Sequence, residues 1–191
     1  MRFTKQVAAG VALSASLALV AVPAAAAATC APEPTSQPFA HVGDDNEYFL
    51  VPGGDFEGTA SWTAAGNAAI VDGGDNGIDA GAKVAKLPQN ASVTSESVCF
   101  DAARPHLRFV SRAVSSGGTM RIDAIDDSGT KTLLGKFDAT DYPRWQATPF
   151  VPLAGPLGVT GDASKRAKLR ITALNGEWLV DAVYVDPYFR G

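Results

Sequence analysis

Short apolar runs separated by turn residues constrain the fold of this chain more than any other feature. Apolar and polar residues alternate one by one in residues 120–124 and again in residues 168–173, which is the period of a strand with one buried face. The pair Asn175-Gly176 directly after the second run is a strong signal for a two-residue hairpin turn. About ten such runs follow residue 46 without a long helical period, so the chain is predicted to be all-β.

The spacing of the runs predicts a single jelly-roll β-sandwich of about 8–10 antiparallel strands. Residues 145–153 contain Pro149 and Pro152. Because proline lacks an amide hydrogen, this strand is expected at the edge of a sheet.

Two segments at opposite ends of the domain are predicted to lie side by side. Residues 51–62 have the pattern of a glycine-rich turn that enters a short strand with Trp62, and residues 177–187 that of a strand buried on both faces. The second segment carries an acidic residue, Asp181, in apolar surroundings. Desolvating a carboxylate is costly, so Asp181 is expected to have a partner where the first and last strands meet.

The N-terminus has the pattern of a secretory signal peptide. Arg2 and Lys5 form a basic region, residues 7–22 are apolar and uncharged, and residues 24–28 are all alanine. Small residues after an apolar stretch are typical of signal cleavage, whereas a membrane anchor, the alternative, needs about 17 or more apolar residues. We expect residues 1–28 to be removed, which predicts a secreted protein without a membrane span.

Cleavage leaves a proline-rich, extended lead-in at residues 29–46 and a β-sandwich domain at residues 47–191. That length suits one domain. The whole chain has 16 basic and 20 acidic residues, and two of the basic residues lie in the signal. An acidic chain without a basic patch is not expected to bind nucleic acid.

Cys30 and Cys99 are the two cysteines of the chain. In an exported protein such a pair predicts a disulfide bond, and two free thiols are the alternative. The bond would tie down an N-terminus that would otherwise fray.

The inventory of catalytic side chains is thin. Neither His41 nor His106 has a cysteine or second histidine at metal-ligand spacing, and no nucleophile-elbow motif is present. The adjacent acids 44–45 and 126–127 occur in turns, whereas glycoside hydrolysis needs two acids that face each other. The protein is therefore predicted not to be an enzyme, and a secreted hydrolase is the least favoured alternative.

Glu57 and Asp181 are the candidate metal ligands. Calcium prefers oxygen ligands, and the neighbouring Gly53 and Gly54 leave backbone carbonyls free to serve. The alternative is that Glu57 caps local amides and that Asp181 pairs with an arginine or a lysine.

Aromatic side chains in irregular segments are the candidate ligand-binding residues. Tyr142, with Arg144 beside it, and Tyr188 lie outside the regular strand patterns. An exposed ring can stack on the apolar face of a sugar while polar groups bind the hydroxyls. The three tryptophans lie in apolar strand patterns and are predicted to pack in the core: Trp62, Trp145 and Trp178.

Two motifs carry a family resemblance. The sequence GDFEG at residues 54–58, followed by Ser61-Trp62, resembles the opening of galactose-binding-domain-like β-sandwiches, which include several carbohydrate-binding modules. The sequence WLVDAV at residues 178–183 is similar to their last strand. The chain also resembles small secreted proteins of actinobacteria. The resemblance implies a β-sandwich fold.

The family often holds a structural calcium ion with a glutamate and the closing aspartate. By motif match these residues are Glu57 and Asp181. The chain departs from the family pattern at Gly53, where asparagine is usual, and at Ala182, which replaces a second aspartate.

Three functions follow as expectations. The first is a secreted, non-catalytic binding module for a carbohydrate or cell-wall glycan. The second is an extracellular structural or protein-interaction module that recognises a cell-surface protein, and the third is the hydrolase already named. The oligomeric state is left open.

Overall fold

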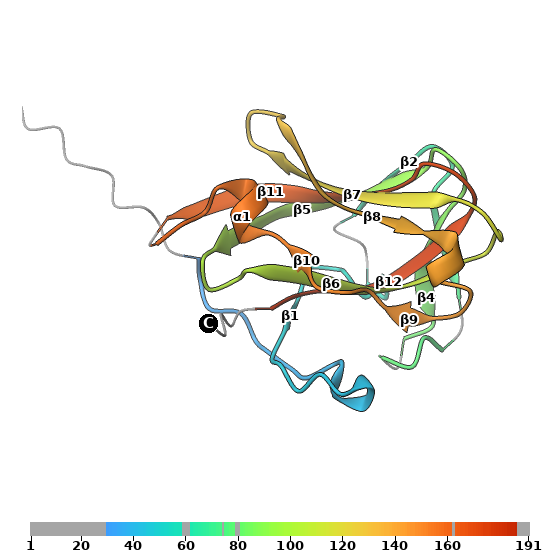
Figure 1. Ribbon diagram of the computed structural model, residues 1–191, viewed down its shortest axis with the longest axis horizontal. Helices are drawn as coiled ribbons and strands as arrows, with labels where there is room; N and C mark the ends of the chain where they lie inside the picture. Colours follow the sequence, from blue (N-terminus) through green and yellow to red (C-terminus); the bar gives the residue numbers. More distant parts are fainter. Residues whose placement is uncertain (1–29, 59–61, 74, 79–80, 162, 187–191) are drawn as a thin grey trace, which may run out of the picture.

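Two antiparallel sheets packed face to face form the protein (Figure 1). The structure is a computed structural model, and it describes residues 30–58, 62–73, 75–78, 81–161 and 163–186. Nine of the twelve strands in this part are three residues or longer. The predicted all-β antiparallel sandwich is confirmed.

The first sheet has the strand order β10-β6-β12-β4-β3, with β1 paired to β12 and β9 paired to β6. Its strands are β1 (Phe49–Leu50), β3 (Ala69–Asp72), β4 (Lys83–Leu87), β6 (His106–Ala113), β9 (Gln146–Ala147), β10 (Val151–Pro152) and β12 (Trp178–Asp186).

The second sheet has the strand order β2-β5-β11-β7-β8. Its strands are β2 (Thr63–Ala65), β5 (Ser92–Asp101), β7 (Thr119–Asp126), β8 (Lys131–Asp138) and β11 (Ser164–Ala173). Three short helical turns complete the described elements: η1 (Ala40–Val42), η2 (Ala139–Asp141) and α1 (Ala154–Leu157).

The inner faces of the two sheets form the main core. In β11, Ala167, Leu169 and Ile171 are fully buried, whereas Lys168 between them is exposed. This alternation follows from the strand geometry, which turns successive side chains to opposite faces. Two of the tryptophans, Trp62 and Trp178, lie in this core as predicted.

A second apolar cluster lies on the outer face of the first sheet. Phe39 and Tyr48 from the N-terminal segment pack edge-to-face with Tyr184 of β12, at ring-centroid distances of 5.8 and 6.5 Å. Because this segment covers β12 from outside (Figure 1), all nine residues of that strand are buried. The predicted extended lead-in therefore packs against the sheet and contains η1 and a fully buried phenylalanine.

The two end segments meet, as the sequence predicts. The Val51 amide donates to the Val183 carbonyl at 2.9 Å, and the Val183 amide donates to the Gly54 carbonyl at 3.0 Å. Phe49 of β1 stands opposite Val185 of β12. The glycine-rich turn is thereby fixed against the last strand.

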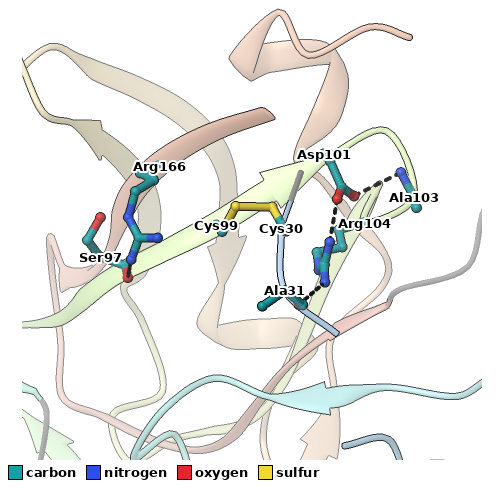
Figure 2. The surroundings of a disulfide bond; sticks show 8 residues. All are labelled: Cys30, Ala31, Ser97, Cys99, Asp101, Ala103, Arg104 and Arg166. Carbon is teal, nitrogen blue, oxygen red and sulfur yellow. Dashed lines mark hydrogen bonds and ion pairs between the residues drawn. A yellow bond between two sulfur atoms is a disulfide. The ribbon is translucent and has the colours of Figure 1, made fainter. Parts of the chain in front are cut away.

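The predicted disulfide joins Cys30 to Cys99 of β5. Figure 2 shows that it fastens the start of the described chain to the second sheet, with Arg104 and Arg166 on either side. Arg104 donates to the Ala31 carbonyl at 2.7 Å, which adds a second attachment for the same segment.

The predicted edge strand at residues 145–153 is confirmed in position but is broken in two. β9 pairs with β6 over two residues, and β10 pairs with β6 further along. Since neither proline can donate a ladder hydrogen bond, the segment forms two short pieces instead of one strand.

Candidate functional site

A groove on the outer face of the first sheet is the best candidate for a functional site. It has a volume of about 340 Å³ and lies between η1, the loop before β4 and the segment leading into β9. We call it the outer groove, defined by its lining residues: His41, Val42, Asn76, Ile78, Arg108, Val110, Arg144, Trp145, Gln146 and Ala147.

Trp145 supplies the aromatic ring of the outer groove. It directly precedes β9, whose Ala147 stands opposite Val110 of β6. The ring packs against the outer apolar cluster but is only half-buried, and the Arg112 guanidinium lies 5.7 Å from its centroid. The prediction that Trp145 packs in the core is therefore wrong, because the register of β9 places it on the outer face of the sheet.

Polar side chains surround this ring. Arg144 is exposed and Gln146 half-buried, and both line the groove. Asn76 is buried at its base, where its Nδ2 donates to Asp181 Oδ2 at 2.6 Å and its Oδ1 accepts from the Ile78 amide at 2.7 Å. Asn76 is a functional candidate that no sequence motif singles out.

Arg108 forms another wall of the outer groove and is held firmly. Its Nη1 forms an ion pair with Asp44, and its Nε donates to the Thr148 carbonyl at 2.7 Å. The guanidinium lies 4.8 Å from the ring centroid of Phe39 and 5.3 Å from that of Phe150. These contacts fix the N-terminal segment against β6.

Asp44 joins this wall to Tyr48, whose hydroxyl donates to Asp44 Oδ2. Burial raises the pKa of Asp44, but hydrogen bonds from Tyr48 and the Asn46 amide and the charge of Arg108 outweigh it, so the net pKa is lowered. Burial and the hydrogen bond to Asp44 raise the pKa of Tyr48. Asp44 is therefore ionised and Tyr48 neutral around neutral pH.

The three predicted ligand-binding residues have different outcomes. Arg144 lies in the outer groove. Tyr142 is only 4% exposed and packs in the main core, with its ring centroid 5.8 Å from those of Phe137 and Trp178. Burial raises its pKa to about 12. A ring without an exposed face cannot stack on a ligand, so Tyr142 is removed from the candidates. Tyr188 lies outside the described residues.

Glu57 and Asp181 contact hydrogen-bond donors. Glu57 Oε1 accepts from the Lys83 amide, which lies 26 residues further along the chain and is not one of the local amides of the alternative. Asp181 accepts from the Ala182 amide at 2.8 Å and from Asn76 Nδ2 at 2.6 Å. These N–H groups occupy part of the acceptor capacity of the two carboxylates, and calcium binding by Glu57 and Asp181 stays a prediction.

The two histidines lie on different elements, His41 on η1 and His106 on β6. His41 is exposed on η1 at the rim of the outer groove. His106 lies 5.3 Å from the Phe150 ring centroid and 4.0 Å from Asp186 Oδ2. Within the described ranges, no three histidine, cysteine or acidic side chains gather as a metal site, and no helix there is long and apolar enough to span a membrane.

A second cavity, of about 520 Å³, lies beside the disulfide. Arg104 and Arg166 reach this region from opposite sides (Figure 2), and each guanidinium donates to a backbone carbonyl. Phe49 is the aromatic residue of its described lining, and it is 3% exposed. Because this cavity offers no open ring, the outer groove is the better candidate for a sugar site.

No protein-family model and no curated protein matches this chain. Several solved structures are similar to it at low identity. The family 6 carbohydrate-binding module of a laminarinase from Zobellia galactanivorans is 10% identical, with 65% of this chain and 90% of that chain covered and a TM-score of 0.47. The family 11 module from Clostridium thermocellum, in complex with a mixed-linked tetrasaccharide, is 13% identical over 72% of this chain and 95% of that chain, with a TM-score of 0.46.

The family 22 xylan-binding domain from Paenibacillus barcinonensis is 12% identical over 69% of this chain and 90% of that chain, with a TM-score of 0.47. This chain is thus similar to carbohydrate-binding modules at 10–13% identity.

Proposed function

We propose that this protein is a secreted, non-catalytic carbohydrate-binding module whose ligand occupies the outer groove. The observation that carries the proposal is the half-buried ring of Trp145, which lines the groove beside Arg144, Gln146 and Asn76. One open aromatic surface with polar groups around it is the combination that a sugar ring requires.

The chemistry of a sugar explains this requirement. A pyranose ring presents an apolar face of C–H groups, which stacks on an aromatic ring, and an equatorial belt of hydroxyls, which needs donors and acceptors. The Gln146 amide supplies both, and the Arg144 guanidinium supplies donors. The volume of about 340 Å³ lies within the range of roughly 300–1,000 Å³ that small ligands occupy.

The described lining of the outer groove favours binding without hydrolysis. Glycoside hydrolysis needs two carboxyl groups across the scissile bond, about 5–9 Å apart. No carboxylate is among the described lining residues. The nearby Asp44 and Asp181 are engaged by Tyr48 and Arg108 and by Asn76 and Ala182, respectively.

Secretion is supported by the signal-peptide pattern of residues 1–28 and by the Cys30–Cys99 disulfide, since such bonds persist in oxidising compartments. The protein-interaction alternative would need a contiguous apolar patch. In the part of the chain that the structure describes, the exposed large apolar residues are spread over η1, β3, β8 and two loops: Val42, Ile70, Val114, Leu133 and Phe150.

The proposal is tested by measuring how far soluble polysaccharides retard the protein in affinity gel electrophoresis, with neutral and acidic polymers in parallel. We expect at least one polymer to retard the wild type and Trp145→Ala to weaken that binding by about tenfold or more, as for a central aromatic contact. Leu133→Ala, which removes an exposed apolar side chain from β8 on the second sheet, is the matched control.

Iodide quenching of fluorescence adds a direct readout, because Trp62 and Trp178 are buried and Trp145 is the accessible tryptophan. Bound ligand should protect the wild type from iodide. If a ligand binds with equal strength to the wild type and a folded Trp145→Ala variant, the site is elsewhere. If no polymer binds, the proposed function is wrong.

A further inference from the structure

We propose that the outer groove selects a glycan that carries carboxylate groups, such as a polymer of uronic acids. This inference rests on the proposed function and names its ligand class. It follows from the charges that surround Trp145.

The outer groove has the opposite sign of charge to the rest of the chain. Its described lining contains the basic residues Arg108 and Arg144 and the exposed imidazole of His41, and no acidic residue. The complete chain, in contrast, has a formal net charge of −4. A local cationic lining in an acidic protein attracts anionic ligands to that place.

Two carboxylates contact lining residues of the groove, and neither cancels the charge of Arg144. Asp44 is paired with Arg108, which neutralises that guanidinium and leaves it as a structural wall. Asp181 is 1% exposed and is held by Asn76 and the Ala182 amide. Arg144 is therefore the permanent cation that the groove presents to a ligand.

The contacts of the other arginines also indicate that the cations near Trp145 are available to a ligand. Seven arginines lie in the described part of the chain, and five of them donate to a protein acceptor: Arg104, Arg108, Arg121, Arg166 and Arg170. The remaining two, Arg112 and Arg144, form no ion pair or hydrogen bond within the described ranges. Both lie next to Trp145, Arg144 as its chain neighbour and Arg112 with its guanidinium 5.7 Å from the ring centroid.

Two unpaired guanidinium groups beside one sugar-stacking ring suit a uronate. The planar donor fork of arginine matches the two oxygens of a carboxylate, and a uronate carries its carboxylate on the edge of the ring whose face would stack on Trp145. A neutral sugar could use the same ring but would leave both charges unmatched.

The test compares trigalacturonate with galactotriose, which has the same ring configuration but no carboxylate, by isothermal titration calorimetry. We expect trigalacturonate to bind at least about fivefold more tightly, and Arg144→Gln or Arg112→Gln to weaken it by about fivefold each, the size of an exposed ion pair. Galactotriose binding should change less than about twofold in these variants. Raising the salt concentration should weaken the acidic ligand alone.

Lys168→Gln is the matched control, because Lys168 is exposed on β11 of the second sheet and its loss changes the net charge equally. If galactotriose binds as tightly as trigalacturonate, or if Lys168→Gln weakens binding as much as Arg144→Gln, acidic selectivity is overturned while the proposed function stands. If neither ligand, nor any polymer of the electrophoresis panel, binds, the proposed function itself fails.

Discussion

Replacing Gly54 with alanine tests the seam between the first and last strands. The Gly54 amide donates to the Val51 carbonyl at 2.7 Å, and its own carbonyl accepts from the Val183 amide at 3.0 Å. A Cβ on Gly54 would lie 2.7 Å from the Val183 oxygen and 2.9 Å from the Val51 oxygen. Both are backbone atoms, so neither can rotate away, and the seam has to open by several tenths of an ångström.

Two contributions determine the magnitude of the effect. Forcing a methyl group into a packed site costs about 1–3 kcal/mol. Each of the two backbone hydrogen bonds contributes about 0.5–1.5 kcal/mol, and lengthening them loses part of that amount. We therefore expect Gly54→Ala to lower the free energy of unfolding by about 2–4 kcal/mol, a large part of the 5–15 kcal/mol that is typical of a domain.

Gly58→Ala is the matched control from the same loop. No atom lies within 4 Å of a Cβ at Gly58, and its φ is outside the left-handed region. Alanine there restricts the unfolded chain without a clash in the folded state. We therefore expect the unfolding free energy of Gly58→Ala to equal that of the wild type or to exceed it by up to about 1 kcal/mol.

Urea unfolding of the oxidised protein, followed by tryptophan fluorescence, measures both variants. Trp62 reports on the seam because its Nε1 donates to the Pro52 carbonyl at 3.0 Å. If Gly54→Ala is within about 0.5 kcal/mol of the wild type, or if Gly58→Ala is destabilised equally, the close approach of the turn to β12 does not limit stability and the reasoning is refuted.

Three further predictions concern single contacts. The folded-state pKa of Asp44 is lowered below 3.8, so its contribution to stability is present above pH 3.8 and is lost as the pH falls through the folded pKa. The unfolding free energy of Asp44→Asn should therefore depend less on pH in this acidic range than that of the wild type. An identical pH dependence of the two proteins would contradict the prediction. Reducing the Cys30–Cys99 bond should destabilise the fold by up to about 4–5 kcal/mol on the chain-entropy estimate, and equal urea midpoints with and without reductant would show that the link constrains nothing. A calcium chelator should change the melting temperature of the protein by less than about 1 °C, since Glu57 and Asp181 accept from N–H donors. A fall of several degrees would support the calcium prediction.

The local pattern of the sequence predicted the strands well. In β11 the alternation of apolar and polar residues matches the buried and less buried faces, because a strand turns successive side chains to opposite sides. In β7 the apolar residues are buried as predicted, but Asp123 between them is buried too and accepts from Arg121. The seam was also predicted, and the glycine-rich turn contributes to it because glycine allows another backbone to approach closely. The carboxylate of Asp181 instead accepts from Asn76, which lies outside residues 51–62.

The outer groove was not predictable in the same way. Tyr142 and Trp145 are three residues apart in one irregular segment, and the prediction assigned the ligand-binding role to the first and the core to the second. In the structure Tyr142 packs on Trp178 in the main core, whereas the pairing of Ala147 with Val110 places Trp145 on the outer face of the sheet. The proline-interrupted edge and the neighbouring Arg144 were the signals that could have indicated an exposed tryptophan.

The sequence by itself thus determined the all-β class, the disulfide and the meeting of the two chain ends. The class follows from residue periodicity, and the other two follow from residue types with few structural options, a cysteine pair and a glycine-rich turn. Only the tertiary structure decided which aromatic ring is open and which arginines are unpaired. Those properties depend on which segments come to lie against each face of the sheet. Phe39 and Tyr48 cover one part of the outer face, and the uncovered part beside them is the groove in which Trp145 meets Arg144.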